Sequence, residues 1–351
     1  MGYSMMNKLR VGYVPNSPDL SAPGDRRRVV FWANARGHQI VTDLSQRVDV
    51  IVLSERSNFT KFLENLEVPA VLDLVDGYLA RESIARDWIR GILKVADKQL
   101  TGLPRPYTSY VKNICSSVSG VLCSSEEQRL MIEKFSSNVH IILDSHNEIP
   151  LLNTNFTNSD SKSILWEGQP VTLGGVLGIS EVLLDEFYER NTQINFITNE
   201  KYFKYLGKYS SRNTHSLLSS HLGAMVTERS IIPWTVDSLT NYAKLSSAAI
   251  LPVLLSNPIQ YLKPENRLLI MWRLGLPTLT SNTPAYARVA RETGLDFICE
   301  NLPEWKQKID KVLSDQRYAA EMVSVGKDYL YKTHNNEQLL KKWDAAIESV
   351  L

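Results

Sequence analysis

The chain has 351 residues, about twice the length of a common single domain, which predicts two domains. Hydrophobic residues make up 43% of it and charged residues 22%, a composition typical of a globular protein that buries large cores. The 39 basic and 38 acidic residues give a net charge of +1, which excludes a generally basic nucleic-acid-binding protein and an acidic disordered tail.

The cysteines and the apolar segments both bear on the compartment. Cys115, Cys123 and Cys299 lack the spacing of a disulfide framework or of a Cys-rich zinc site. The longest strongly apolar stretch, residues 248–255, is much shorter than the ~20 residues that span a bilayer. The first residues lack the pattern of a secretory signal. We therefore expect a cytoplasmic protein.

Short apolar segments alternate with helical patterns along the first half of the chain. Segments that are apolar along nearly their whole length predict strands buried on both faces, and their alternation with helices predicts a parallel sheet. The expected strands are residues 9–14, 49–53, 68–74, 120–123 and 139–143. The expected helices are residues 27–35, 59–66 and 126–135.

The composition then changes, and the alternation resumes after the change. Residues 150–163 are rich in Asn, Ser and Thr without a sustained period, which predicts an interdomain linker. The strands expected after it are residues 163–166, 194–198, 221–226, 249–254, 277–280 and 297–299. The expected helices are residues 179–189, 236–246, 265–274, 286–293 and 303–313. The sequence thus predicts two successive α/β domains of similar size.

The last segment, residues 336–350, predicts one more helix. Its apolar residues fall on a single helical stripe that includes Leu339, Trp343 and Ile347. A stripe of this kind predicts burial but does not identify the partner surface. The helix therefore either closes the second domain or crosses back to brace the first.

Several common catalytic signatures are absent from the sequence. No GxGxxG follows the first expected strand, which disfavours a nicotinamide-dependent dehydrogenase. GxxxxGK[ST], HExxH and GxSxG are also absent, as is an Asp-x-Asp pair. The six histidines are scattered without ligand spacing, so we expect no metal.

Residues 257–286 carry the most informative pattern. They follow a buried strand and predict a helix with Pro264 in its first turn. Lys263, Asn266 and Arg267 cluster at the amino end of that helix. Free backbone N–H groups and the helix dipole make such an end an anion site, and adjacent cations strengthen it for a phosphate. The alternative is an ordinary surface helix with a solvated basic start.

This segment resembles the donor-binding signature of GT-B glycosyltransferases of the broad "glycosyl transferases group 1" kind. In that family a strand is followed by a helix of the pattern K-x-x-N-K/R, then G-x-P and a second strand. The chain has these residues in the same order: Lys263, Asn266, Arg267, Gly275 and Pro277.

Three other segments resemble the same superfamily. Residues 234–253 resemble the helix and strand that precede its donor site. ILWEGQPVTLGG, which begins at Ile164, resembles the strand and glycine turn that open its second domain. The stretch from Pro23 to His38 resembles a capsule-type glycosyltransferase opening. Together the segments cover most of the chain.

The resemblance implies an α/β protein with the GT-B architecture, in which two Rossmann-like domains have parallel sheets that face a cleft. Residues 1–150 would form the acceptor-side domain, residues 151–335 the nucleotide-sugar-binding domain, and residues 336–351 a helix that packs on the first domain. The implied activity is metal-independent transfer of a sugar from a nucleotide-sugar donor to a hydroxyl of a glycan or lipid-linked acceptor. No cofactor and no nucleic-acid partner are expected. A peripheral contact with the inner face of the membrane is expected.

The resemblance and the helix-end argument together give the donor-binding residues. These residues are expected to hold the diphosphate of the donor, where they would stabilise the charge of the leaving group. They are Gly168, Lys263, Pro264, Glu265, Asn266 and Arg267.

Carboxylates after two expected strands give the candidate catalytic residues. Ligands of such a fold gather at the carboxyl ends of the strands, where a carboxylate can take the proton of an acceptor hydroxyl. Asp76 is the first candidate for this general base and Asp25 is the second. The alternative for Asp76 is a turn residue before Gly77.

The remaining acceptor-side candidates are Gly24, Arg26 and Asp73. The basic cluster of residues 26–28 predicts contact with an acceptor phosphate or with a membrane surface. A solvated helix face is the alternative.

The donor segment departs from the family pattern at one point. The family often carries two Glu residues seven positions apart, and alignment on Gly275 and Pro277 puts Leu262 and Ile270 at those places. Glu265 is nearby but out of register. A catalytically silent GT-B subunit that binds a glycan or scaffolds a partner therefore stays open as an alternative, as does a sugar-nucleotide epimerase of the same fold.

Overall fold

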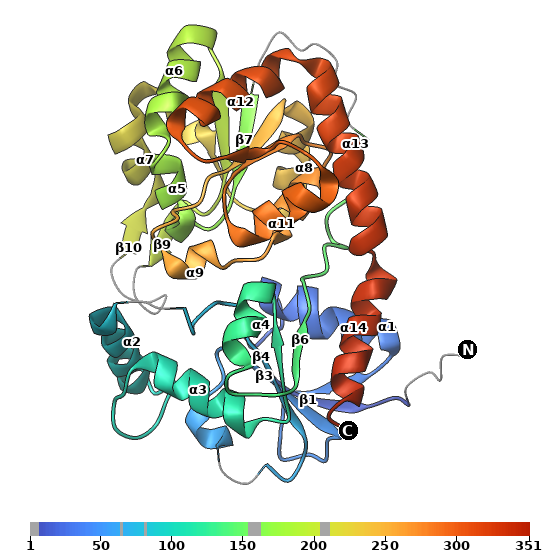
Figure 1. Cartoon of the computed structure of the whole chain (residues 1–351). Helices are drawn as coiled ribbons and strands as arrows, with labels where there is room; N and C mark the ends of the chain where they lie inside the picture. Colours follow the sequence, from blue (N-terminus) through green and yellow to red (C-terminus); the bar gives the residue numbers. More distant parts are fainter. Residues whose placement is uncertain (1–6, 64–65, 81–82, 154–162, 204–210) are drawn as a thin grey trace. The chain divides into compact units, whose positions relative to one another are not determined.

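The structure is a computed structural model that describes residues 7–63, 66–80, 83–153, 163–203 and 211–351 (Figure 1). The chain divides into two compact units. The first is Met1–Asn147 together with Asn335–Leu351, and the second is Glu148–His334. Most of the expected linker lies outside the described residues.

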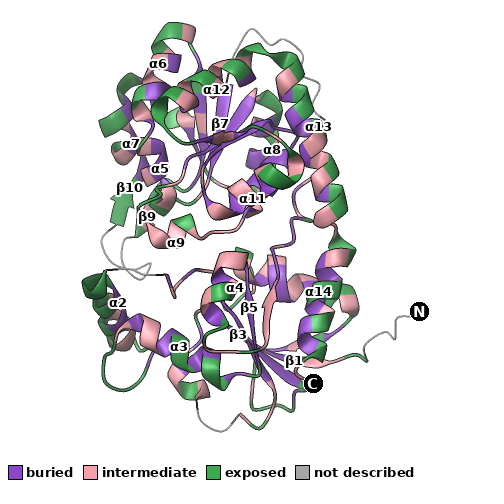
Figure 2. Cartoon of the chain, viewed as in Figure 1, coloured by how far each residue is buried: buried purple, intermediate pink, exposed green. Residues whose placement is uncertain are grey.

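The first unit is built on a six-stranded sheet of order β2-β1-β3-β4-β5-β6. Every neighbouring pair of these strands is parallel. The strands are β1 (Arg10–Val14), β2 (Gln39–Val41), β3 (Val50–Ser54), β4 (Ala70–Asp73), β5 (Gly120–Cys123) and β6 (Val139–Ile141). All residues of β3, β4 and β5 are buried, as expected for strands covered on both faces (Figure 2).

Helices cover both faces of this sheet, because alternate strand residues join two different cores. One core includes a π-turn (Asp25–Val29), α1 (Val30–Arg36) and α14 (Asn336–Glu348). The other includes a 3-10 turn (Phe59–Phe62), α3 (Tyr107–Ser117) and α4 (Glu126–Ile132). A further helix, α2 (Ile84–Ala96), is mostly exposed (Figure 2).

The C-terminal helix α14 belongs to the first unit, which settles where its apolar stripe is buried. Trp343 is 1% exposed and stacks on Trp32, with ring centroids 5.5 Å apart. At the edge of this contact Asp344 accepts a hydrogen bond of 2.9 Å from the indole N–H of Trp32. The same carboxylate lies 2.7 Å from the guanidinium of Arg36. Packing and an ion pair therefore fix α14 against α1.

The second unit has its own six-stranded parallel sheet, of order β11-β8-β7-β12-β13-β14. The strands are β7 (Ser163–Glu167), β8 (Gln193–Ile197), β11 (Ile231–Ile232), β12 (Ala248–Leu251), β13 (Thr278–Ser281) and β14 (Ile298–Cys299). In chain order this is 3-2-1-4-5-6, the doubly wound Rossmann arrangement. The strand order reverses between β7 and β12. A separate antiparallel hairpin joins β9 (Lys201–Phe203) to β10 (Ser211–Asn213).

The helices of the second unit lie between these strands along the chain, except the last two, which follow β14. They are α5 (Gly174–Leu177), α6 (Ser180–Arg190), α7 (Thr214–Leu222), α8 (Val236–Leu245), α9 (Pro258–Tyr261), α10 (Asn266–Arg273), α11 (Pro284–Thr293), α12 (Leu302–Ser314) and α13 (Gln316–Thr333). No helix in the described parts of the chain combines the length and the apolar character that crossing a membrane requires.

One expected strand is a helix in the structure. Residues 221–226 form the end of α7 and a 3-10 turn, Gly223–Met225. The reason lies upstream, where the Asn213 side chain accepts a hydrogen bond of 2.9 Å from the Ser216 N–H and caps the helix start. The third strand of the sheet is instead β11, which has only two residues.

The other differences concern where the helices begin and end and which elements were not expected. The helix expected at 59–66 is a 3-10 turn that ends at Phe62, and the one expected at 126–135 ends at Ile132. Pro264 lies two residues before α10, outside its first turn. Other helices and strands have no counterpart among the expected ones: β2, β9, β10, β11, α2, α3, α5, α7, α9 and α13.

Candidate functional site

The second unit gathers polar residues where its strand order reverses, between β7 and β12. Glu167 is the last residue of β7, and Gly168 follows it. Arg267 lies in the first turn of α10. In open parallel sheets, ligands bind at the carboxyl ends of the strands at such a reversal. The three residues therefore lie where the fold provides a ligand site.

Arg267 is held beside the end of β7 by two neighbours. Its Nε lies 3.4 Å from Oε2 of Glu167, and its guanidinium carbon lies 5.2 Å from the centroid of the Trp166 ring. A Cβ atom on residue 168 would stand 3.0 Å from Nη2 of Arg267. Gly168 thus leaves the space that the guanidinium occupies.

Four polar atoms of this cluster are buried without a hydrogen-bond partner among the described residues. They are the donors Nε and Nη2 of Arg267 and the acceptors Oδ1 of Asn266 and Oε2 of Glu167. The helix also begins without a side-chain cap on its backbone N–H groups. A buried donor without a partner costs free energy, so Nη2 of Arg267 and the uncapped N–H groups of this helix end are suited to an anionic ligand that would accept their hydrogen bonds.

The last residue of the cluster is a tryptophan that follows the edge strand β11. Trp234 follows β11, and its indole N–H donates a hydrogen bond of 2.9 Å to Oε1 of Glu167. Glu167 therefore holds Trp234 with one oxygen and Arg267 with the other. Behind them, burial raises the pKa of Tyr286 to about 12, so this phenol stays neutral near physiological pH.

Glu265 faces a different set of partners from its neighbours on α10. Its carboxylate is buried, 3.6 Å from the Arg288 guanidinium and 4.0 Å from Nε2 of His334. These contacts direct the Glu265 carboxylate toward the interior of the second unit and favour a structural role over the predicted contact with the donor. Lys263 lies before the helix and is half-buried.

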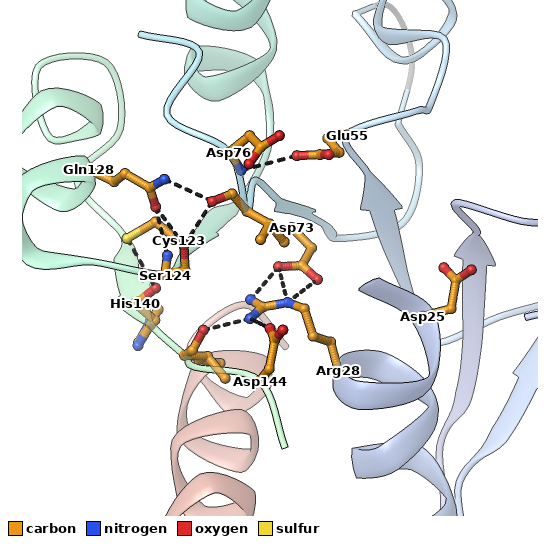
Figure 3. A network of polar contacts seen from close by, with 12 residues as sticks. Asp25, Arg28, Glu55, Asp73, Asp76, Cys123, Ser124, Gln128, His140 and Asp144 are labelled. Carbon is orange, nitrogen blue, oxygen red and sulfur yellow. Dashed lines mark hydrogen bonds and ion pairs between the residues drawn. The ribbon is translucent and has the colours of Figure 1, made fainter. Parts of the chain in front are cut away.

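In the first unit, an arginine connects the carboxyl ends of two strands (Figure 3). Arg28 is fully buried and donates hydrogen bonds of 2.6 and 2.8 Å to the two oxygens of Asp73, the last residue of β4. It also donates to the carbonyl of Ile142, at 2.7 Å, and to Asp144, at 3.2 Å. Burial raises the pKa of Asp73, and the Arg28 guanidinium opposes that rise.

Asp76 lies just beyond this ion pair, in the loop after β4, and is half-buried. Its backbone N–H donates to Glu55 at 3.1 Å, and the Tyr78 hydroxyl donates to its Oδ2 at 3.4 Å. The preceding carbonyl, that of Val75, accepts hydrogen bonds of 2.8 Å from both Ser124 and Gln128. The loop is therefore held at a fixed place beside the strand ends (Figure 3).

Asp25 has a fully occupied environment. It is 0% exposed, and its Oδ1 accepts hydrogen bonds from the Tyr13 hydroxyl and from the backbone and side chain of Asn16. Its Oδ2 accepts from the backbone and hydroxyl of Ser17. Burial and the hydrogen bond to Asp25 raise the pKa of Tyr13 well above its ordinary value. A carboxylate so enclosed organises the loop after β1, which favours a structural role over that of a base.

Comparison with known proteins decides the architecture. No protein-family model matches the sequence, and the search of curated proteins gave no significant match. Solved structures do match. WaaG, a glycosyltransferase involved in lipopolysaccharide biosynthesis, superposes with a TM-score of 0.55 at 12% identity, over 96% of this chain and 98% of its own. Sucrose-phosphate synthase from Thermosynechococcus elongatus gives 0.56 at 12%, over 96% and 80%. The chain has the GT-B fold.

TarM is a third structure with this fold, and the match to it is partial. Its TM-score is 0.59 at 12% identity, and the superposition covers 85% of this chain. This chain spans about half of TarM, 54% of its length. Identities this low establish the GT-B architecture alone.

On the GT-B fold, the predicted residues fall into two groups. Gly168, Asn266 and Arg267 lie together in the second Rossmann-like unit, while Asp73 and Asp76 neighbour each other in the first. The basic cluster at 26–28 is divided. Arg28 is enclosed in the core, so the expected exposed basic patch is not formed as a whole.

The two other acceptor-side candidates stand before Arg28. Arg26 is half-buried, and its guanidinium donates to the Ser21 carbonyl at 2.6 Å. Gly24 precedes the π-turn, and a Cβ atom there would stand 2.8 Å from the Asn16 amide. Both residues therefore belong to the loop that Asp25 organises.

Sequence reasoning missed the partners that hold these GT-B sites in place. Glu167 and Trp234 were not singled out, although Glu167 is the last residue of an expected strand and a polar residue there is a signal. Ser124 and Gln128 were also missed as residues that fix the Val75 carbonyl. Their helix start was recognised, but its contact with a loop about fifty residues earlier was not visible.

Among the residues that the structure describes, no three His, Cys, Asp or Glu side chains are grouped to hold a metal ion. Burial raises the pKa of Cys115, Cys123 and Cys299 to about 12. These thiols therefore stay protonated near neutral pH and are poor nucleophiles.

Proposed function

We propose that this GT-B protein transfers a sugar from a nucleotide-sugar donor to a hydroxyl of a glycan or lipid-linked acceptor. One observation carries the proposal, the buried Nη2 of Arg267 beside the uncapped start of α10. A diphosphate placed there would accept hydrogen bonds from that nitrogen and from the first-turn N–H groups. TarM, which shares the fold, has been solved with UDP.

The reaction would follow from what each group can do. Arg267, the helix end and Lys263 would stabilise the negative charge that develops on the nucleotide diphosphate as the bond to the sugar breaks. These groups supply positive charge from the protein itself, so we propose a transfer that needs no metal ion. Gly168 would let the diphosphate approach the end of β7 closely.

On the acceptor side, we propose that Asp76 removes the proton of the attacking hydroxyl. It is half-buried, and the Glu55 and Tyr78 contacts fix its loop. A base held in this way contributes typically 10²–10⁴-fold to a rate.

The test is nucleotide release from a panel of UDP-, GDP- and CMP-sugars, with and without glycan and lipid-linked acceptors. Release that requires an acceptor supports transfer. An altered free sugar nucleotide without an acceptor would identify an epimerase. No turnover, combined with no calorimetric binding of any nucleotide, would overturn the donor site. Tight nucleotide binding without turnover would leave the silent subunit, for which Leu262 and Ile270 at the family's Glu positions are the reason.

A further inference from the structure

Helix α2 of the first unit presents its apolar residues to the solvent. Ile84 is 80% exposed, Ile89 50%, Ile92 46% and Trp88 43%. In an α-helix, residues three and four apart are neighbours, so Ile84, Trp88 and Ile92 form one row and Ile89 lies beside it. Leu103, in the loop that follows, is 82% exposed. We call these five residues the α2 face.

The opposite side of α2 faces the protein and carries the polar residues Asp87 and Lys94. Asp87 is buried and accepts hydrogen bonds of 2.9 and 2.6 Å from the N–H and the hydroxyl of Thr108, which orients the start of α3. Gly91 is buried against the chain at Arg105, whose carbonyl oxygen would stand 1.8 Å from a Cβ at residue 91. Nζ of Lys94 lies 4.9 Å from the centroid of the Tyr107 ring. The helix is therefore reversed relative to an ordinary surface helix, which buries its apolar side.

The exposed charged residues of α2 and of the loop that follows it have one sign. Arg86, Lys98 and Arg105 are exposed. Over the described residues 83–106, Asp87 is buried and Asp97 is half-buried, so neither acid is fully exposed. Arg86 and Ile89 are three residues apart and therefore adjacent on the helix surface. An apolar patch with a basic border is complementary to an anionic surface with an apolar interior.

We propose that the α2 face docks on an anionic phospholipid bilayer, with α2 lying in the plane of the interface. The isoleucines and Leu103 would enter the boundary between headgroups and acyl chains, and Trp88 would sit at headgroup level. Arg86, Lys98 and Arg105 would contact the lipid phosphates. The inference goes beyond the proposed transfer, because it concerns a different surface and can be tested without donor or acceptor.

The docking helix is connected to the acceptor-side loop within the same unit. The Arg90 guanidinium carbon lies 5.4 Å from the Tyr78 ring centroid, and Tyr78 donates to Asp76. The Tyr78 and Tyr107 rings meet edge to face, with centroids 5.2 Å apart. α2 docked on a bilayer would therefore hold the loop of Asp76 near a lipid-linked acceptor.

The test is co-sedimentation of the full chain with vesicles of phosphatidylcholine alone and of phosphatidylcholine mixed with phosphatidylglycerol. We expect binding to the anionic vesicles that weakens as salt is added, because salt screens the basic border. The Ile89→Ser/Ile92→Ser variant should bind at least about tenfold more weakly, since two apolar side chains would be lost from the interface. Arg86→Glu/Arg105→Glu should lose the preference for anionic vesicles.

Leu130→Ser is the matched control, because Leu130 is an exposed apolar residue (55%) of α4 in the same unit, outside the α2 face. It should bind vesicles as the unchanged chain does. Calorimetric binding of UDP should be the same in all variants, which separates this proposal from the donor site.

Several results would overturn the docking proposal. One is equal vesicle binding by the Ile89→Ser/Ile92→Ser variant and the unchanged chain. Another is no vesicle binding at all, together with a dimer in light scattering that this variant abolishes, which would make a second copy the occupant of the face. A third is no vesicle binding with a lowered melting temperature of the variant, which would place the face against another part of the same chain.

Discussion

The guanidinium carbon of Arg267 lies 5.2 Å from the centroid of the Trp166 ring. An arginine over an aromatic ring is held by a cation–π interaction and has little remaining freedom. Glu167 fixes the Nε side of the same group at 3.4 Å. The Nη2 atom therefore occupies a defined position before any ligand arrives, and a ligand would not have to order it.

We expect Arg267→Ala to weaken the binding of a nucleotide diphosphate by about 1.5–3 kcal/mol, the value of a hydrogen bond that involves a charged group. Arg267→Lys should recover only part of this, because an ammonium lacks the planar fork that the site holds. Titration calorimetry with UDP and GDP measures the difference. Arg291→Ala, on the exposed surface of α11 in the same unit, is the control. Unchanged affinity in a folded Arg267→Ala variant would remove Arg267 from the donor site.

Turnover should survive EDTA with at most a modest loss. The reason is that Arg267, Lys263 and the start of α10 are proposed to carry the charge of the leaving group. The measurement is nucleotide release before and after chelation, and again after Mg²⁺ or Mn²⁺ is added back. A complete stop that either metal reverses would contradict the helix-end mechanism.

Asp76→Asn should leave donor affinity unchanged and lower kcat by 10²–10⁴-fold, the usual cost of losing a general base. The side chain keeps its size, and the contact of its backbone N–H with Glu55 does not depend on the carboxylate. The measurements are kcat on the true acceptor and the melting temperature. A normal kcat with a lowered melting temperature would make Asp76 a structural turn residue.

Asp25→Asn should act in the opposite way, on stability first. An amide would put an NH2 group in place of one carboxylate oxygen, so its two N–H donors would face a partner that is itself a donor, either the Ser17 N–H or the Asn16 N–H. We expect a loss of about 3 kcal/mol or more in the free energy of unfolding, because a buried polar network would be left unsatisfied. Urea unfolding measures it. Full stability combined with lost turnover would return Asp25 to the list of candidate bases.

Lys94 gives the first unit a stability that rises with pH. Burial lowers its pKa from 10.5 to about 8. Between those two pH values the unfolded chain binds more protons at this site than the folded chain does. The free energy of unfolding therefore increases as the pH rises through the window.

Lys94→Met should remove this gain while keeping the apolar stem over the Tyr107 ring. We expect the unchanged chain to gain about 1–3 kcal/mol relative to the variant between pH 7 and pH 10, from the size of the shift. Urea unfolding of both proteins across this range gives the difference, and other groups that titrate there cancel. A difference independent of pH would show that Lys94 is not desolvated.

The α/β class and the two-domain division were predictable because they rest on local patterns, and the resemblance of the donor segment implied the GT-B fold. Wholly apolar runs such as 50–53 are buried on both faces wherever they lie in a parallel sheet. The two-residue strand β11 carries no such signal. Residues 221–226, where a strand was expected, end a helix whose start is capped by Asn213. For α14, the apolar stripe predicted burial, but only tertiary structure could show that Trp343 meets Trp32.

The candidate site was predictable in its second-unit part and less so in the first. The order of the motif placed Arg267 at a helix start, and the end of β7 placed Gly168 nearby. The contact of Arg267 with Glu167 could not be predicted from the sequence, because it depends on how α10 packs. Arg28 shows the limit most clearly. A run of three arginines usually marks a solvated face. Here Asp73 and Asp144, which are distant in sequence, form ion pairs with Arg28 and allow it to be buried.

The membership of α14 in the first unit has a consequence for synthesis on the ribosome. Translation delivers residues 1–147 first and then the entire second unit before α14 emerges. Until then, the side of the first sheet that receives Trp343 and Ile347 is covered only by the π-turn and α1, and the apolar surface that α14 buries stays open. The second unit can finish folding while the first waits with an open apolar face. In that interval the earlier-made unit is the more aggregation-prone part of the nascent chain, and it is the part that a ribosome-associated chaperone would have to shield.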